Sequence, residues 1–332
     1  MNKKLAIVFL GIFSIFLFAI INNNKENQYS ISVLEISYIP LNETNNDLID
    51  LNIIGPYLKQ ETTVEELRER IKTISNKLIV DLEEGSSYLK YKDSSSKPII
   101  DYNIIERKEF LRPILRTNNL EWIFNENTDW GMTADHFNEL KNIDICGYVD
   151  NKGVKEVWIW MYHNALSLDE NRYYVSPTES NMASKYGDIS NSYRINDLPI
   201  CKNTYTVYEY NYTRGVGEAL ENHTHQIEAV LEHYENKSWN YFIGDDSEPF
   251  GCGWTHCPPN VMLDCSNHNY DWKNETIVAS YCGGANTNIN CHAWSGDTCN
   301  DHDGEKFKVW WMQNIPEEWW RYIADLDSIA KK

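Results

Sequence analysis

The chain has 332 residues, which is enough for one large domain or two modest ones with a substantial core. Asp and Glu number 49 against 30 Lys and Arg, and the formal charge of -19 repels phosphate backbones, so we expect no nucleic-acid partner. The hydrophobic fraction of 42% is that of a globular protein and excludes a largely disordered chain.

Residues 1–21 predict a signal anchor or a signal peptide. Lys3 and Lys4 precede seventeen uncharged residues, which as a helix would span about 25 Å, close to the thickness of a membrane's hydrocarbon layer. An A-x-A cleavage pattern is missing at the end of this run, which favours an anchor over a cleaved peptide. In either case we expect the membrane to be a partner of this segment, a polar tether at residues 22–30, and a body outside the cytoplasm.

Residues 31–249 predict an α/β body. A strand at 32–39 precedes a helix at 63–84, which opens with a T-V-E-E capping box, and a short strand at 87–92 follows. This order is a βαβ unit of a parallel sheet. Residues 93–150 are expected to be an insertion of short helices and loops. The helix has an apolar stripe that consists of Val64, Leu67, Ile71, Ile74, Leu78 and Leu82.

Two aromatic-rich strands follow, at 155–162 and 204–212, and the second leads directly into a helix at 214–234. At least four strands therefore alternate with helices, which predicts an α/β fold with a mostly parallel layered sheet. Ligands of such sheets bind beyond the carboxyl ends of the strands. That rule directs attention to His163 and to residues 211–217.

Residues 250–332 predict a loop-rich segment that is stapled by disulfides and ends in a helix packed on the body. Short strands are expected at 277–281 and 307–312, and the final helix at 316–329.

The cysteines favour disulfides over a zinc–cysteine site. Six of the eight lie between Cys252 and Cys299, and only one pair approaches the close spacing of zinc ligands. An even number of cysteines in a body outside the cytoplasm fits an oxidised protein. Cys146 and Cys201 are then left to pair with each other.

The helix at 214–234 has two distinct faces at 100° per residue. Its apolar face includes His223, which we expect to be buried and neutral. The opposite face has two open interpretations, either an ordinary solvated acidic face or a metal or acid–base site. It consists of Arg214, Glu218, Glu221, His225, Glu228 and Glu232.

A divalent cation, Zn²⁺ or Ca²⁺, is the cofactor that this region could bind. Glu221 and His225 are four residues apart and therefore adjacent on the helix, and His256 can reach them from the Cys-rich segment. Asp301 and Asp303 resemble half of a calcium loop, although the closing glutamate of such a loop is missing.

Three residues are candidates for catalysis. His163 follows a strand end, Glu218 could act as a base, and Arg214 could hold an anionic group. A surface ion pair between Arg214 and Glu218 is the alternative. The G-V-G at 215–217 alone is weak evidence for phosphate binding.

Four strings resemble a family of uncharacterised secreted microbial proteins. They are GDISNS at 187–192, NYTRGVGEALENHTHQIE at 211–228, CGWTHCPPN at 252–260 and WWMQNIP at 310–316. The resemblance extends over roughly residues 30–325 and implies a secreted protein built as one unit. It implies no activity and no functional residue.

These patterns predict an extracytoplasmic, metal-dependent hydrolase that acts on peptide or glycan. The alternatives are a non-catalytic surface or secreted protein that binds glycan or peptide through aromatics on disulfide-held loops, and a structural surface protein. Twelve Trp and 21 Tyr could serve such binding, although large aromatic side chains are buried by default. Burial of Glu218, Glu221 and Glu228 would favour a metal site, because exposed carboxylates need no partner.

Overall fold

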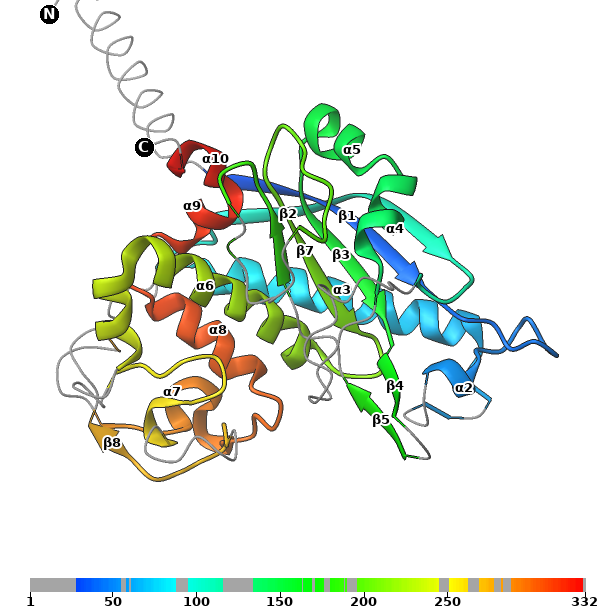
Figure 1. Ribbon diagram of the computed structural model, residues 1–332. Coiled ribbons are helices and arrows are strands. Elements are labelled where there is room, and N and C mark those ends of the chain that lie inside the picture. The colour runs from blue at the N-terminus through cyan, green and yellow to red at the C-terminus, as the bar shows by residue number, and fades with distance from the viewer. Residues whose placement is uncertain are drawn as a thin grey trace, which may run out of the picture.

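A five-stranded sheet forms the centre of the protein, with strand order β2-β1-β3-β7-β6 (Figure 1). The computed structural model describes residues 28–54, 58–59, 61–87, 95–115, 134–162, 164–168, 171–175, 180–187, 189, 196–244, 251–261, 269–277, 282 and 288–330. Four strands are parallel, namely β1 (Tyr29–Tyr38), β2 (Ile100–Phe110), β3 (Val154–Met161) and β7 (Tyr205–Asn211), and β6 (Ser180–Ala183) is antiparallel to β7. The predicted α/β class is confirmed.

Helices and two small antiparallel sheets complete the described structure. The small sheets pair β4 (Asn164–Leu168) with β5 (Asn171–Val175) and β8 (Thr276–Ile277) with β9 (Asn288–Ile289). The α-helices are α2 (Leu51–Ile54), α3 (Val64–Gly85), α4 (His136–Asn142), α5 (Ile145–Lys152), α6 (Val216–Ile243), α7 (His292–Ser295), α8 (Glu305–Asn314), α9 (Trp319–Ala324) and α10 (Leu326–Ile329).

The predicted βαβ unit is present, but its second strand lies further along the chain than expected. β1 pairs in parallel with β2 at residues 100–110, inside the region that the sequence indicated to be an insertion. The sequence of β2, IDYNIIERKEF, is half charged because the strand lies at an edge of the sheet and is only partly buried, so its period-2 pattern is weak. Of the strand expected at 87–92, Ser87 is not in a strand and the other residues lie outside the described chain.

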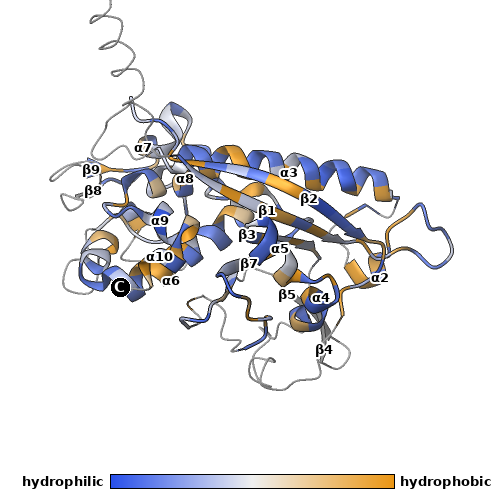
Figure 2. Cartoon of the chain, turned by 90° about the horizontal axis from the view of Figure 1, so that it is seen from above, coloured by the Kyte–Doolittle hydropathy of each residue, from blue (hydrophilic) through white to orange (hydrophobic). Residues whose placement is uncertain are grey.

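Helix α3 agrees with its sequence prediction. Thr63 is the N-cap, and the capping box is complete because Glu66 accepts a hydrogen bond from the Thr63 backbone and donates its own backbone N–H to the threonine hydroxyl. The six residues of the predicted apolar stripe are all buried. This helix covers one side of the sheet and α4 and α5 cover the other (Figure 2).

The two faces of the sheet have different chemistry. On the face that α3 covers, Ser75 of α3 bonds to Glu35 of β1 and the buried His223 of α6 stacks on Tyr208 of β7, so α3 and α6 share this face. It is rich in aromatic and acidic groups. The opposite face has aliphatic strand residues such as Ile159, with one buried acid, Glu209, that contacts His136 of α4. Burial lowers the pKa of His223 well below its usual value, which agrees with the neutral imidazole that we expect.

The C-terminal region departs from prediction at its helices. Residues 307–312 were expected to be a strand but belong to α8, because the Asp301 carboxylate accepts the backbone N–H groups of Lys306 and Phe307 and so caps the start of a helix. Asp301 thus has a structural role at the start of α8, and the calcium loop that it resembles stays a prediction. The final helix is divided into α9 and α10 at Asp325, whose backbone is not helical.

Three disulfides join described residues. Cys146–Cys201 is the predicted pair, and Cys252–Cys282 and Cys291–Cys299 staple the C-terminal segment as expected. Cys257 is also disulfide-bonded, and no described cysteine is free. Disulfides persist in oxidising compartments, which supports a body outside the cytoplasm.

The predicted anchor or signal peptide at 1–21 and most of the tether at 22–30 lie outside the described residues. Within the described part of the chain, no helix has the length and apolar character needed to span a membrane.

Helix α6 is enclosed on two sides. Its apolar face lies on the sheet, and α8 packs against both α6 and α3 (Figure 1). The G-V-G at the start of α6 serves this packing rather than phosphate binding. A Cβ at Gly217 would lie 2.5 Å from the carbonyl oxygen of Asp303, so only glycine allows this close approach.

Glu156 yields a prediction about pH. This side chain of β3 is fully buried, and it accepts hydrogen bonds from Tyr102 (3.0 Å) and Trp158 (2.8 Å). Burial raises its pKa from 4.5 to about 8 despite these bonds. Between pH 4.5 and about 8, Glu156 is ionised in the unfolded chain but protonated in the folded chain. The free energy of unfolding therefore falls as the pH rises through this range.

The variant Glu156→Gln should therefore gain stability relative to the wild type as the pH rises from about 5 to 8. The difference in unfolding free energy between variant and wild type should grow by about 1.4 kcal/mol for each pH unit between the pKa of Glu156 in the unfolded chain and that in the folded chain. Urea unfolding at several pH values measures it, with the exposed Glu65→Gln as control. Parallel stability curves for the wild type and Glu156→Gln would contradict this assignment.

Candidate metal centre

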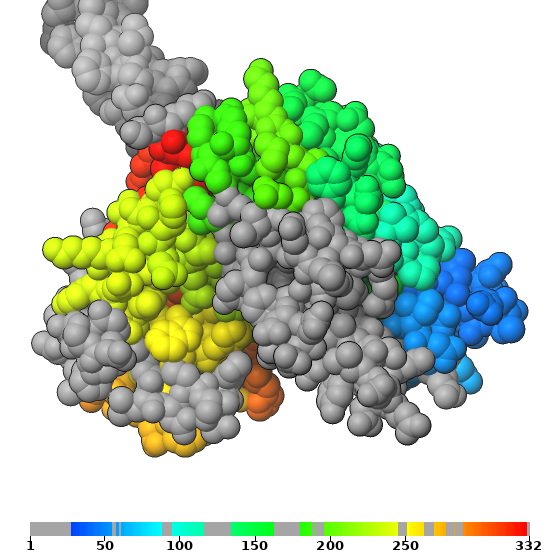
Figure 3. Space-filling view, viewed as in Figure 1, coloured from blue at the N-terminus to red at the C-terminus, as the bar shows by residue number. Residues whose placement is uncertain are grey.

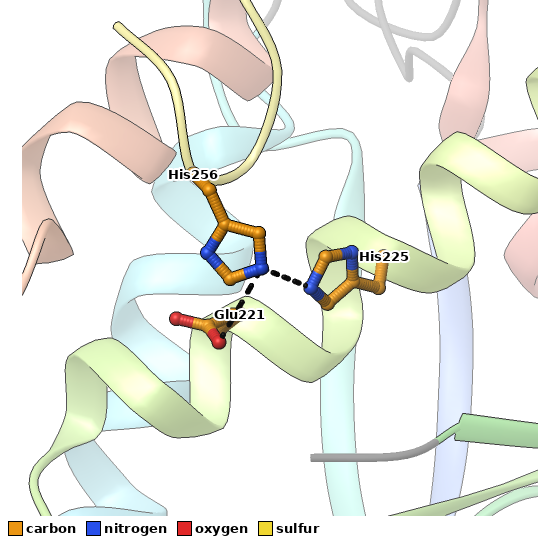
Figure 4. A group of neighbouring side chains, drawn as sticks. All are labelled: Glu221, His225 and His256. Atoms are coloured by element: carbon orange, nitrogen blue, oxygen red, sulfur yellow. Dashed lines mark hydrogen bonds and ion pairs between the residues drawn. The ribbon is translucent and has the colours of Figure 1, made fainter. Parts of the chain in front are cut away.

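Glu221, His225 and His256 converge on one point (Figure 4). One possible ligand atom from each residue lies within 4.8 Å of the other two. The Nε2 atoms of His225 and His256 are 2.9 Å apart, and His256 Nε2 is 3.8 Å from a carboxylate oxygen of Glu221. At 2.9 Å one imidazole must donate a proton that the other accepts, and a cation that replaces this proton would find both nitrogens facing it.

Helix periodicity supplies two of the three groups. Glu221 and His225 are four residues apart on α6, so their side chains project side by side from the face opposite the sheet. The spacing alone predicted this pair. The carboxyl-end rule did not, because the cluster lies along the outer side of a helix rather than at the strand ends.

A rigid loop supplies the third group. His256 lies in a tight turn where Trp254 and Cys257 exchange backbone hydrogen bonds of 3.1 and 2.8 Å. Gly253 has a positive φ of 76°, and a Cβ there would lie 1.9 Å from the carbonyl oxygen of Cys257, so the turn requires glycine. The disulfide of Cys252 anchors the start of this turn. Residues 251–261 lie directly on the surface of α6 (Figure 3).

Glu228 connects the loop to the helix and orients His225. One carboxylate oxygen lies 2.8 Å from His225 Nδ1, and the other accepts the backbone N–H of Thr255 at 2.8 Å. Because a carboxylate only accepts, Nδ1 carries the proton and Nε2 is directed at the cluster. Burial alone would lower the pKa of His225, but its contacts with Glu228 outweigh burial and raise it. Burial likewise raises the pKa of Glu228, and its partners outweigh this and lower it.

Lys308 holds the second oxygen of Glu221. Its side chain is fully buried, and its ammonium group lies 3.6 Å from Glu221 Oε2, 3.0 Å from the Asp303 carbonyl oxygen and 4.7 Å from the ring centre of Tyr270. Burial lowers the pKa of this lysine. The contact leaves Glu221 Oε1 as the oxygen on the side of His256. With both imidazoles neutral, Glu221, Glu228 and Lys308 have a formal charge of -1, which a cation or a proton on His225 would offset.

The donor set fits Zn²⁺ better than Ca²⁺. Two imidazole nitrogens and one carboxylate are ligands of zinc, whereas calcium takes six to eight oxygens. Three protein ligands leave one position of a tetrahedral site for water or substrate, as in catalytic zinc sites. The side chains of Glu221, His225 and His256 are 19%, 18% and 28% exposed, so solvent reaches the cluster.

The middle of the acidic face of α6 is covered, while Arg214 and Glu232 at its two ends are exposed. The side chains of Glu218, Glu221 and Glu228 are 7%, 19% and 19% exposed. The covering groups come from the Cys-rich segment and α8, as the contacts of Thr255 and Lys308 show. Of the two interpretations that the sequence left open, the structure therefore favours the one that requires compensating charge.

The other predicted site residues lie outside this cluster. Arg214 and Glu218 form an ion pair at the start of α6, and Glu218 is not among the convergent ligand atoms. His163 lies outside the described residues, so its role stays a prediction. Sequence reasoning missed Lys308, because residues 307–312 were expected to be a strand. The one signal in the sequence for a buried charge here was that Lys308 lies within the otherwise apolar run at 307–312.

No protein-family model matches this chain, and neither a curated protein nor a solved structure shows significant similarity to it. The resemblance of its four strings to a secreted microbial family stays a prediction.

The orienting role of Glu228 can be tested by metal binding. Glu228→Gln should weaken Zn²⁺ binding about 10- to 100-fold, because the imidazole of His225 loses the carboxylate that fixes its tautomer and direction. Titration against a competing chelator measures the change. Glu232→Gln, which removes an exposed carboxylate one turn further along the same helix, should leave the affinity unchanged. Equal losses in the two variants would point to a general electrostatic effect instead.

Proposed function

We propose that the protein is a zinc-dependent hydrolase that acts outside the cytoplasm. The observation that carries this proposal is the convergence of three potential zinc ligands from two segments, with outer partners on His225 and Glu221. Polar side chains that only fill an interface have no reason to direct their ligand atoms at one point. The pattern of two imidazoles, one carboxylate and an accessible fourth position is that of catalytic zinc sites.

Each residue has a defined part in this proposal. Glu221, His225 and His256 hold the cation, Glu228 orients His225, and Lys308 directs one oxygen of Glu221 inward. Zinc, when bound, lowers the pKa of water to about 7 and polarises a carbonyl group.

This chemistry suits attack on an amide, whereas glycosidic bonds are usually cleaved by a pair of carboxylic acids. The substrate class is then a peptide bond or the N-acyl group of a glycan.

The non-catalytic alternative has less support. Among the described residues, the exposed large aromatics are Tyr186, Tyr241 and Trp272, while the greater number of tryptophans and tyrosines are buried. A binding surface built on aromatic stacking would need more of these side chains in contact with solvent.

Metal content and hydrolysis provide the main test. The oxidised full chain should contain about one zinc per molecule, and it should cleave either a fluorogenic peptide mixture or the N-acetyl groups of a chito-oligosaccharide. The double variant Glu221→Gln with His225→Ala should lose both zinc and activity, because two of three ligands are gone. His233→Ala removes an exposed histidine from the same helix and is the control.

Different outcomes separate the parts of this proposal. Unchanged metal content and stability in the double variant would mean that α6 is only a scaffold. Stoichiometric zinc without hydrolysis of either substrate class would leave the metal site but refute the enzyme, and would favour the binding protein.

The location has its own test. We infer that residues 1–21 act as an anchor that keeps the body at the outer face of a membrane, because a cleavage pattern is missing. The protein should remain with the membrane fraction and retain its N-terminal segment. A mature chain that begins near Asn22 in N-terminal sequencing would show a cleaved signal peptide instead.

A further inference from the structure

A second site lies away from the metal centre. A cleft of about 280 Å³ lies between the N-terminal half of α3 and the carboxyl ends of β1 and β2. In parallel α/β sheets this edge is where ligands bind. The residues that line the cleft include none of Glu221, His225 and His256. The proposed hydrolase function therefore leaves this cleft without a role.

A buried carboxylate forms the floor of the cleft. The side chain of Glu35 is 5% exposed, and its Oε1 accepts hydrogen bonds from the Ser75 hydroxyl and from Trp160 Nε1. Its Oε2 accepts from Arg107 Nε. The negative charge of Glu35 is thus compensated by one arginine, and that arginine is fixed in place at the cleft.

The guanidinium of Arg107 has N–H donors that are not used within the described structure. Its side chain is 52% exposed, and among the described residues its one side-chain hydrogen bond is made through Nε to Glu35, which leaves both terminal amino groups as donors. Arg68, by comparison, uses Nε and one terminal nitrogen for Glu109 and the other for Glu65. A planar fork that is already held by a buried carboxylate is suited to bind a carboxylate through two parallel hydrogen bonds.

The charge of the lining restricts the ligand further. Four cationic and four acidic residues line the cleft, so its formal charge is zero. A polyanion would be repelled by the glutamates, whereas a ligand with one carboxylate and one ammonium group would find a partner for each. Glu65 and Glu69 are exposed acidic groups that pair with Arg68 and Lys72, and each has room to share its charge with the ammonium. The volume lies near the lower end of that of small-molecule sites.

We propose that this cleft binds a small zwitterion, a free amino acid or short peptide, with its carboxylate on Arg107. The probe is unblocked Ala-Ala-Ala, compared with its C-terminal amide and its N-acetyl form. Calorimetric titration of the full chain in EDTA keeps the metal centre out of the measurement. The tripeptide should bind with a Kd below about 1 mM, the amide at least about tenfold more weakly, and the acetylated form also more weakly.

Variants of Arg107 complete the test. Arg107→Gln should abolish binding of the tripeptide, but it also leaves Glu35 buried without its cation and can destabilise the fold. Arg107→Lys keeps that charge and removes the fork, so a folded protein with at least about tenfold weaker binding is expected. Arg321→Gln, which removes an arginine paired with Glu318 on α9, is the matched control.

Three results would overturn the assignment. Equal affinity for the tripeptide and its amide would remove the role of the carboxylate. Wild-type affinity in Arg107→Lys would remove the role of the fork. Failure of all three peptides to bind at about 10 mM would show that the cleft is not a site for such ligands. None of these results depends on whether the metal centre is catalytic.

Discussion

Glu228 accepts hydrogen bonds from two directions, from His225 on its own helix and from the backbone of Thr255 in the facing turn. The other features of the candidate metal centre depend on this double contact. It orients one imidazole, and it holds the turn that brings the second imidazole within 2.9 Å of the first. Without it, the Cys-rich segment would still be stapled by its disulfides, but the position of His256 above α6 would lack its polar anchor.

The enclosure of α6 explains why Glu221, Glu228 and Lys308 are partly or fully buried. An amphipathic helix usually packs one face and leaves the other to solvent. Here the polar face is covered as well, because Gly217 lets Asp303 approach the helix and α8 adds Lys308 from the same side. Two carboxylates and one ammonium are therefore partly or fully removed from water together. Such burial requires compensation, and the two facing imidazoles mark where a cation would supply it.

Local sequence signals predicted local structure well. The capping box and apolar stripe of α3 and the two faces of α6 followed from periodicity, since each depends on residues within a few turns. The position of β2 and the helical state of residues 305–314 did not follow from the periodicity of the sequence. An edge strand such as β2 has a weak pattern, and the helix at Glu305 is set by the Asp301 cap within a short apolar run that fits either state.

Only the part of the candidate site that depends on local helix periodicity could be predicted from the sequence. The adjacency of Glu221 and His225 is a helix property, but the arrival of His256 depends on how a loop thirty residues away folds back on the helix. Cysteine parity and location indicated the Cys146–Cys201 disulfide, whereas the pairings Cys252–Cys282 and Cys291–Cys299 required the fold. The charge on Lys308 could be interpreted only once its partners were known.

The disulfide of Cys252 also links the proposed cation site to the redox state of its surroundings. His256 is four residues from this cysteine, in a turn whose start is held by the disulfide together with backbone hydrogen bonds from Cys252 and Gly253 to the end of α6. In reducing surroundings this turn would lose its covalent link, and the third donor of the proposed site would be held less firmly. Oxidation would therefore strengthen the proposed site, whose affinity for a cation would be highest where the disulfide is formed.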